Sequence, residues 1–148
     1  MSIDVSTEIL INRPRDAVAA FASNPDNVPA WYGNIKSVEW KTPRPMRVGS
    51  RLAFVAHFLG RQLAYTYEIV EWVEGKRLVM RTSEGPFPME TTYIWEAGPS
   101  GGTRMVLRNS GMPSGFSRWL AAFMAVAVRR ANRKDLAILK RHLESGAA

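Results

Sequence analysis

Two histidines, His57 and His142, are the residues best suited to acid–base chemistry in this chain of 148 residues. An unperturbed imidazole titrates close to neutral pH, which makes histidine the commonest general acid or base. His142 lies among basic residues near the C-terminus, and we expect it at the surface. His57 lies in a segment that is apolar at both parities, so the pattern does not decide which way it faces. His57 is therefore the single catalytic candidate, and no catalytic set is assigned.

Several kinds of site are excluded by composition and spacing. The chain has no cysteine, which excludes disulfides, thiolate metal sites and a cysteine nucleophile. Two histidines without carboxylates at ligand spacing do not form a metal site. The glycines of residues 98–102 lie between predicted strands rather than before a helix, so they do not form a phosphate-binding loop. We expect neither a metal nor a cofactor.

Aromatic, hydroxyl and amide side chains recur at alternate positions of the predicted strands. Together with apolar residues of the C-terminal segment they form a set without carboxylate, lysine or arginine. Such a set suits a neutral, mostly apolar ligand that a few hydrogen bonds orient. The alternative is that these side chains are simply core. The candidate ligand-binding residues are Trp31, Tyr65, Tyr67, Met80, Thr91, Tyr93, Trp95, Met105, Leu107, Asn109, Phe116, Leu120 and Met124.

The elements that must position these residues follow from hydrophobic periodicity. Ile3–Ile11 alternates with period two, which predicts a half-buried strand. Pro14 then opens a short helix, and a second short helix ends near Trp31. From Ile35 to Gly111 six alternating segments are joined by short turns, so these strands must be antiparallel.

A long C-terminal helix is predicted from Ser114 to Ser145, with Ser114 as its N-cap and Gly146 as its stop. Its first half is apolar nearly all round, and its second half narrows to the stripe Asn132, Leu136, Leu139 and Leu143. No other element is long and apolar enough to cover the dry face of the sheet. We expect one α+β domain over residues 1–148.

Charge and hydropathy suggest where the protein acts. The longest apolar run, Trp119–Val128, is half the length of a membrane span of roughly 20 residues, and we expect a cytoplasmic protein. The net charge of +7 is spread along the chain and comes with no nucleic-acid-binding motif, so we expect no nucleic acid partner. Peripheral contact of basic residues with an anionic membrane is a third interpretation. The oligomeric state is expected to be monomer or homodimer.

The order of these elements resembles the START-like, or helix-grip, superfamily (SRPBCC), which includes polyketide cyclases and dehydrases, lipid-transfer domains and plant hormone-binding proteins. The resemblance covers the whole chain and depends on a series of local similarities in order: Ile9–Val18, Asn24–Trp31, Tyr67–Glu74, Gly101–Met105 and the final helix. It implies a helix-grip fold, in which a seven-stranded curved antiparallel sheet wraps around the long helix and leaves a cavity. It also implies that Trp31 lies near the cavity mouth.

Function follows from the resemblance only as a class. Our leading hypothesis is a protein that binds or carries a small hydrophobic molecule, such as a lipid, an isoprenoid quinone or a polyketide-like aromatic. The alternative is an enzyme of the cyclase/dehydratase type that uses His57 and a pocket tyrosine. The two are separated by whether His57 points into the cavity within reach of Tyr65 or Tyr67.

Overall fold

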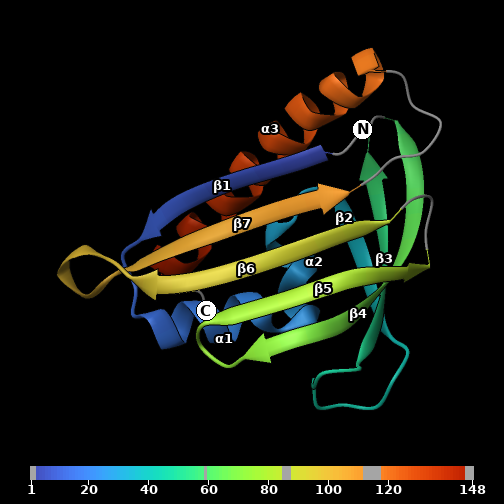
Figure 1. The fold of residues 1–148 in the computed structure, drawn as a ribbon. Helices are drawn as coiled ribbons and strands as arrows, with labels where there is room; N and C mark the ends of the chain where they lie inside the picture. Colours follow the sequence, from blue (N-terminus) through green and yellow to red (C-terminus); the bar gives the residue numbers. More distant parts are fainter. Residues whose placement is uncertain (1–2, 59, 85–87, 112–117, 146–148) are drawn as a thin grey trace.

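The computed structural model describes residues 3–58, 60–84, 88–111 and 118–145. Strand β1 is followed by helix α1, a 3₁₀ turn η1 and helix α2, and then by six strands and helix α3 (Figure 1). The elements are β1 Ile3–Ile11, α1 Arg15–Ser23, η1 Pro25–Asn27, α2 Val28–Trp31, β2 Ile35–Trp40, β3 Arg51–Phe58, β4 Arg61–Val73, β5 Arg77–Glu84, β6 Met89–Ala97, η2 Pro99–Gly101, β7 Thr103–Gly111 and α3 Arg118–Glu144.

The strands form one antiparallel sheet in the order β1-β7-β6-β5-β4-β3-β2. The predicted helix-grip fold is confirmed, with a curved sheet packed against the C-terminal helix (Figure 1). Register shifts between Thr66 and Tyr67 and between Ile69 and Glu71 interrupt the pairing of β4 with β5. Such bulges bend and twist a strand, which accounts for part of the curvature that turns β3 and β4 toward α3.

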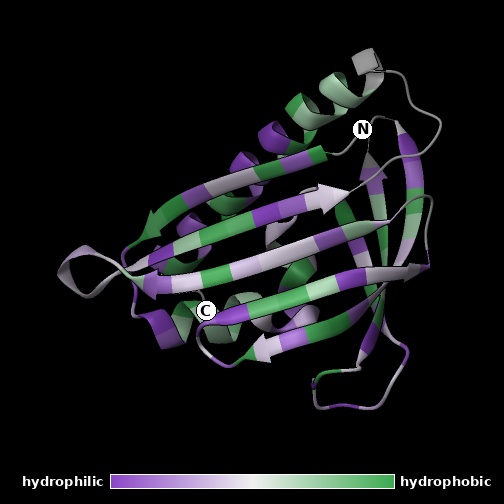
Figure 2. Ribbon diagram, in the orientation of Figure 1, coloured by the Kyte–Doolittle hydropathy of each residue, from purple (hydrophilic) through white to green (hydrophobic). Residues whose placement is uncertain are grey.

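The core lies between the inner face of the sheet and the C-terminal half of α3. Leu136, Leu139 and Leu143 of α3 are at most 1% exposed, and they belong to one cluster with Met105 and Leu107 of β7. Successive residues of a strand face opposite sides, so buried positions of β7 alternate with exposed or partly exposed ones. Polar and apolar residues both occur along the strand (Figure 2). The stripe predicted for the second half of the helix is therefore the surface that packs on the sheet.

The two short helices begin where the sequence places proline. Pro14 precedes α1 as its N-cap residue, and Pro25 lies at the first position of η1. Asn24 caps η1 by accepting a hydrogen bond of 3.0 Å from the backbone N–H of Asp26. The predicted ends of the long helix, Ser114 and Gly146, lie outside the described residues. No helix among the described residues is long and apolar enough to cross a membrane.

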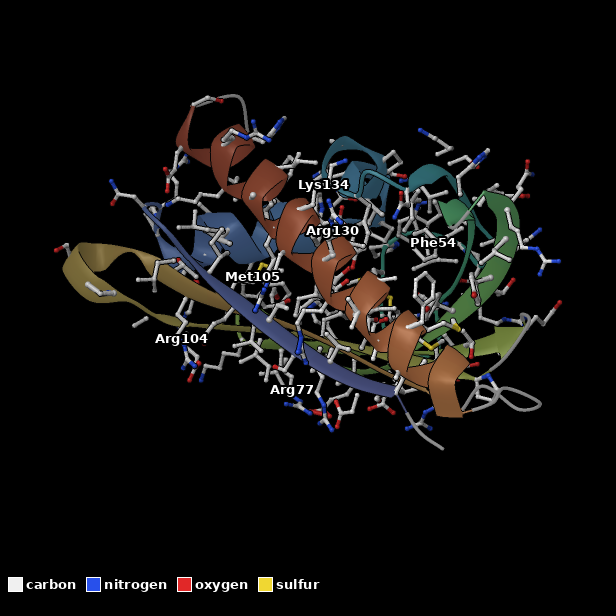
Figure 3. The ribbon with its side chains drawn as sticks, turned by 90° about the horizontal axis from the view of Figure 1, so that it is seen from above. Phe54, Arg77, Arg104, Met105, Arg130 and Lys134 are labelled. Atoms are coloured by element: carbon white, nitrogen blue, oxygen red, sulfur yellow. The ribbon has the colours of Figure 1, made fainter. Side chains whose placement is uncertain are left out.

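The outer face of the sheet carries arginines that are paired with carboxylates. Arg104 contacts Glu8 and Glu96, and Arg108 contacts Asp4. Figure 3 shows Arg77 and Arg104 on the side of the sheet opposite α3, whereas Met105 points toward the helix. The arginines of this face are thus largely neutralised locally, and exposed pairs of this kind contribute little to stability.

Candidate ligand cavity

A cavity of about 160 Å³ lies between α3 and the strongly bent half of the sheet. Its wall is mostly apolar and aromatic, and a few polar side chains converge on it. Pockets for small molecules have this composition. The lining residues are Tyr32, Asn34, Ile35, Phe54, Ala56, Leu63, Tyr65, Tyr67, Met89, Asn109, Met124, Val128, Ala131, Asn132 and Asp135.

The aromatic wall comes from β3 and β4. Phe54 packs edge-on against Tyr67 at 5.8 Å between ring centroids, and Tyr65 lies 6.1 Å from Tyr67. Because Phe54 and Ala56 line the cavity, the alternating strand points His57 to the opposite side, where it is exposed. His57 therefore cannot act on a ligand in this cavity, and the hypothesis that pairs it with a pocket tyrosine is not supported by the geometry.

A pair of tyrosine hydroxyls lies beside the cavity, which Tyr32 lines. The Tyr32 and Tyr93 oxygens lie 2.7 Å apart, and either hydroxyl can donate. Burial raises the pKa of both phenols well above the ordinary value near 10. Both tyrosines are therefore neutral near pH 7, and they satisfy each other's hydrogen-bonding needs.

A chain of polar side chains crosses from the sheet to α3. The Thr91 hydroxyl donates to Asn109 Oδ1 at 2.6 Å. Asn109 Nδ2 in turn donates to Asn132 Oδ1 at 3.2 Å. Asn132 Nδ2 is buried and has no partner among the described residues. Burial raises the pKa of Tyr67 to about 12, and the nearby Thr91 hydroxyl partly offsets this rise.

Asp135 places a carboxyl group in the cavity wall, which corrects the expectation of a wall without carboxylates. It lies one helical turn after Asn132 and is only 3% exposed. Its Oδ1 accepts a hydrogen bond of 3.0 Å from the backbone N–H of Gly33. Burial nevertheless dominates, and it raises the pKa of Asp135 to about 6. A carboxyl that titrates near neutral pH is a candidate for proton transfer.

Comparison with known proteins assigns the chain to a family. A model described as polyketide cyclase/dehydrase and lipid transport matches residues 2–144, which is nearly the whole chain. The chain belongs to this family. No curated protein sequence matches it.

Solved structures share the helix-grip fold of this polyketide cyclase/dehydrase and lipid transport family member. A Thermus thermophilus protein is 20% identical with a TM-score of 0.83, over 98% of this chain and 99% of that one. The Zhui aromatase/cyclase from Streptomyces sp. R1128 is 13% identical with a TM-score of 0.84, over 100% and 97% of the two chains. A START superfamily protein from Mycobacterium smegmatis is 13% identical with a TM-score of 0.74, over 97% and 95%. At these identities the likeness concerns the fold.

The structure brings together only part of the predicted ligand-binding set of this family member. Tyr65, Tyr67, Asn109 and Met124 line the cavity. The other predicted residues that the structure describes lie behind it or in the core, because inner-face positions of a curved sheet also have to fill the space beneath α3. Thr91 reaches the wall through Asn109, Tyr93 lies behind Tyr32, and the residues packed in the core are Trp31, Met80, Trp95, Met105 and Leu107.

Trp31 does not lie at the cavity mouth. Its side chain is 0% exposed and packs 4.3 Å from the ring of Tyr32 and 5.7 Å from that of Tyr93. At the C-terminal end of α2, Trp31 therefore lies in the core and Tyr32 lines the cavity. Phe116 and the side chain of Leu120, both predicted for the helix lid, lie outside what the structure describes.

The predicted ligand-binding set did not include the polar lining residues of α3, Asn132 and Asp135, although the sequence contained a signal for them. Asn132 begins the predicted apolar stripe, and Asp135 lies three residues later, so both fall on the face that Leu136 and Leu139 also occupy. A carboxylate on the buried face of an amphipathic helix is unusual, since burying an unpaired charge is costly. That contradiction marks a candidate functional residue. Tyr32, Phe54 and the other lining residues that were not predicted carried no comparable signal.

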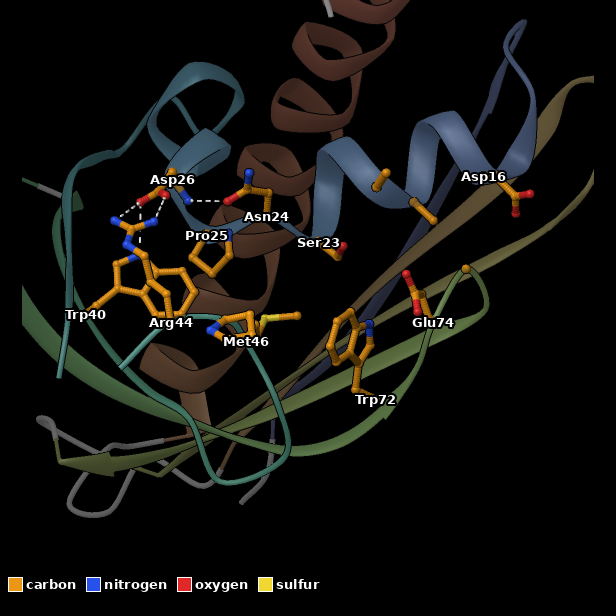
Figure 4. A pocket seen from close by; sticks show the side chains of 14 residues that line it. Asp16, Ser23, Asn24, Pro25, Asp26, Trp40, Arg44, Met46, Trp72 and Glu74 are labelled. Carbon is orange, nitrogen blue, oxygen red and sulfur yellow. Dashed lines mark hydrogen bonds and ion pairs between the residues drawn. The ribbon is translucent and has the colours of Figure 1, made fainter. Parts of the chain in front are cut away.

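A larger pocket of about 780 Å³ lies outside this cavity, among α1, η1, the segment after β2 and the β4–β5 turn. Figure 4 shows Asp26 holding Arg44 and Trp40 at one end of it. The Trp40 indole donates to Asp26 Oδ1 at 2.9 Å, and the Arg44 guanidinium lies 4.6 Å from the Trp40 ring. Four of its lining residues are charged, and three of these, Asp16, Asp26 and Glu74, are carboxylates, so we do not assign a neutral, mostly apolar ligand to it. Among the described residues, no three metal-ligating side chains gather anywhere.

Proposed function

We propose that the protein binds and carries a small, neutral, mostly apolar molecule in the cavity between the sheet and α3. The observation that carries the proposal is that aromatic and aliphatic side chains make up most of the cavity wall, together with a few polar groups. The cavity of about 160 Å³ is compact, which favours a molecule of one or two fused rings over a long-chain lipid. The START superfamily and aromatase/cyclase neighbours support a ligand-binding role.

Filling the cavity should abolish binding. Ala131 lines the cavity, whereas Ala137 is exposed on the same helix. We expect Ala131→Phe to weaken the binding of a polarity-sensitive apolar fluorophore at least tenfold, because the new ring occupies the ligand's space. Ala137→Phe adds the same ring outside and should leave the dissociation constant unchanged. Fluorescence titration of both folded variants measures this, and equal affinities would place the fluorophore outside the cavity.

An enzyme of the cyclase/dehydratase type is the second candidate, and Asp135 is the observation that favours it. Its carboxyl lies in the cavity wall, and burial raises its pKa to about 6, which suits a general acid or base near neutral pH. The aromatase/cyclase neighbour supports chemistry of this class. In this proposal Asp135 takes the place that the sequence assigned to His57.

Turnover of a bound ligand would distinguish the enzyme from the carrier. If Asp135 transfers a proton, Asp135→Asn should lower the rate at least a hundredfold while the ligand's dissociation constant changes only a few-fold. Chromatographic assay of the tightest ligand from a displacement panel, with wild type and variant side by side, measures both quantities. Unchanged ligand after prolonged incubation with the wild type would favour the carrier.

We further propose that the exposed face of α3 contacts an anionic membrane. Arg129, Arg130 and Arg133 are exposed, and no ion pair within the described residues involves them. Phe123 and Val126, earlier on the helix, are 56% and 68% exposed. Basic residues next to exposed apolar ones suit the surface of a membrane with anionic lipids.

A further inference from the structure

The cavity wall holds a hydrogen-bond donor, Asn132 Nδ2, that no described residue satisfies. Asn132 is 4% exposed, and its Nδ2 has no partner among the described residues. A buried donor without an acceptor has lost its hydrogen bonds to water and gained none in return, so it destabilises the protein. Because Asn132 lines the cavity, a ligand can supply the missing acceptor.

The direction of this donor is set from the sheet. Thr91 donates to Asn109 Oδ1, so Asn109 presents its Nδ2 to Asn132 Oδ1 at 3.2 Å. The oxygen of the Asn132 amide is thereby occupied, and its nitrogen is the part left for a ligand. The ligand must therefore carry an acceptor, such as a carbonyl oxygen, at this point.

Asp135 lies one turn further along the same face of α3 and adds an acceptor. Gly33 N–H occupies its Oδ1, and Oδ2 accepts no hydrogen bond within the part of the chain that the structure describes. Asn132 and Asp135, three residues apart, are neighbours on a helix surface. The wall thus presents a donor beside an acceptor, and the lining residues include no lysine, arginine or histidine.

We propose that Asn132 and Asp135 form a donor–acceptor edge that selects a neutral ligand with a hydrogen-bond acceptor next to a donor, and that this edge rejects carboxylates. A primary amide or a carbonyl beside a hydroxyl has the complementary pattern. An anionic ligand would meet Asp135, and no lining residue that the structure describes is a cation that would offset the repulsion. This inference rests on the proposed binding function and names the chemistry of its ligand.

Three probes with the same naphthalene ring distinguish the effects of a hydrogen-bond acceptor, a donor and a negative charge on binding. They are 2-naphthamide, methyl 2-naphthyl ketone and 2-naphthoate. The amide offers an acceptor and a donor, the ketone an acceptor alone, and naphthoate a negative charge. At pH 8 Asp135 is ionised, since its pKa is about 6. We expect the amide to bind at least tenfold more tightly than the ketone, and naphthoate not to saturate the protein, in titrations of the whole chain.

Asp135→Asn tests the edge directly, because its amide oxygen can still accept from Gly33 N–H. The variant should reduce the preference for amide over ketone at least threefold and allow naphthoate to bind. Asp16→Asn, which removes a carboxylate from the outer groove, should leave all three affinities unchanged.

Binding of the three probes and of the apolar fluorophore tests the donor–acceptor edge and the binding function separately. Equal affinity of amide and ketone, or saturable binding of naphthoate to the wild type, overturns the donor–acceptor edge. If none of the three probes binds while the apolar fluorophore does, the edge is overturned and the binding function stands. If the fluorophore fails to bind as well, the binding function itself is overturned.

Discussion

Asp135 shows how neighbours set the chemistry of one residue. Tyr32 from the end of α2 and Tyr93 from β6 face its carboxyl, and both are neutral near pH 7. The Gly33 N–H and, less strongly, Lys134 on the same helix lower the pKa of Asp135. Neither offsets the loss of hydration, so the pKa of Asp135 is higher in the folded protein than in the unfolded chain.

The free energy of unfolding should depend on the ionisation of Asp135. Its pKa is raised from 3.8 to about 6 on folding, so it stabilises the fold fully below pH 4, and this contribution is lost as the pH rises through 6. Relative to Asp135→Asn, the wild type should lose up to about 3 kcal/mol between pH 4 and pH 8. Urea unfolding at several pH values measures the difference.

Asp26 provides a control for this prediction. Hydrogen bonds from Arg44 and Trp40 lower the pKa of Asp26, so its contribution is lost only as the pH falls below the ordinary value near 3.8. Relative to Asp26→Asn, the wild type should therefore show no slope between pH 5 and pH 8. A flat profile for both variants would mean that Asp135 is ionised in the folded protein throughout this range.

Strand β7 is the element that joins the first strand to the rest of the sheet. It pairs with β1 on one side and β6 on the other, so Ile9 and Trp95 flank Met105 in register. Met105 is 0% exposed beneath α3, whereas Leu10 on β1 is 52% exposed on the outer face. The two faces of these neighbouring strands therefore have opposite tolerance for charge.

Met105→Asp should destabilise the fold by roughly 3 kcal/mol or more, because it buries a charge without a partner. Leu10→Asp makes a similar chemical change at an exposed position and should alter the free energy of unfolding by less than about 0.5 kcal/mol. Urea denaturation of both variants at pH 7 measures the contrast. Similar midpoints for the two would contradict the assigned facing of β7.

Across the whole molecule, the net charge of +7 is distributed unevenly between two faces. Arginines of the outer sheet face are matched by carboxylates, as in the pairs Arg81 with Glu90 and Arg77 with Glu71. Arg130 and Lys134 lie on the opposite side, on the exposed surface of α3 (Figure 3). Arg129, Arg130, Arg133 and Lys134 of α3 form no ion pair within the described residues, so this helix carries positive charge without a salt-bridge partner.

Binding to vesicles that contain phosphatidylserine should depend on this face. Each basic residue near an anionic surface contributes about 1 kcal/mol, so Arg130→Glu combined with Lys134→Glu should weaken binding more than tenfold. Raising the ionic strength from about 0.05 to about 0.5 M should weaken wild-type binding steeply. Arg77→Glu on the other face is the control, and co-sedimentation measures all three. An equal loss with Arg77→Glu would indicate attraction by net charge alone.

Consecutive positions of the chain were enough to predict the order of elements and the face on which most residues lie. The alternation of Ile3–Ile11 and of β7 and the stripe ending at Leu143 recur in the structure, and the predicted family and helix-grip fold are confirmed. These features are local, because a period of about 2.0 or 3.6 residues repeats within a single strand or helix.

Which faces meet, and how much room remains between them, depends on the tertiary structure. The pattern around His57 is apolar at both parities, so the pairing of β3 within the curved sheet was needed to place it outside. The Tyr32–Tyr93 hydroxyl pair joins residues 61 positions apart, and the Gly33–Asp135 hydrogen bond joins residues 102 positions apart. Periodicity assigns a residue to a face but does not say what lies across from it, and the chemistry of this cavity depends on those long-range neighbours.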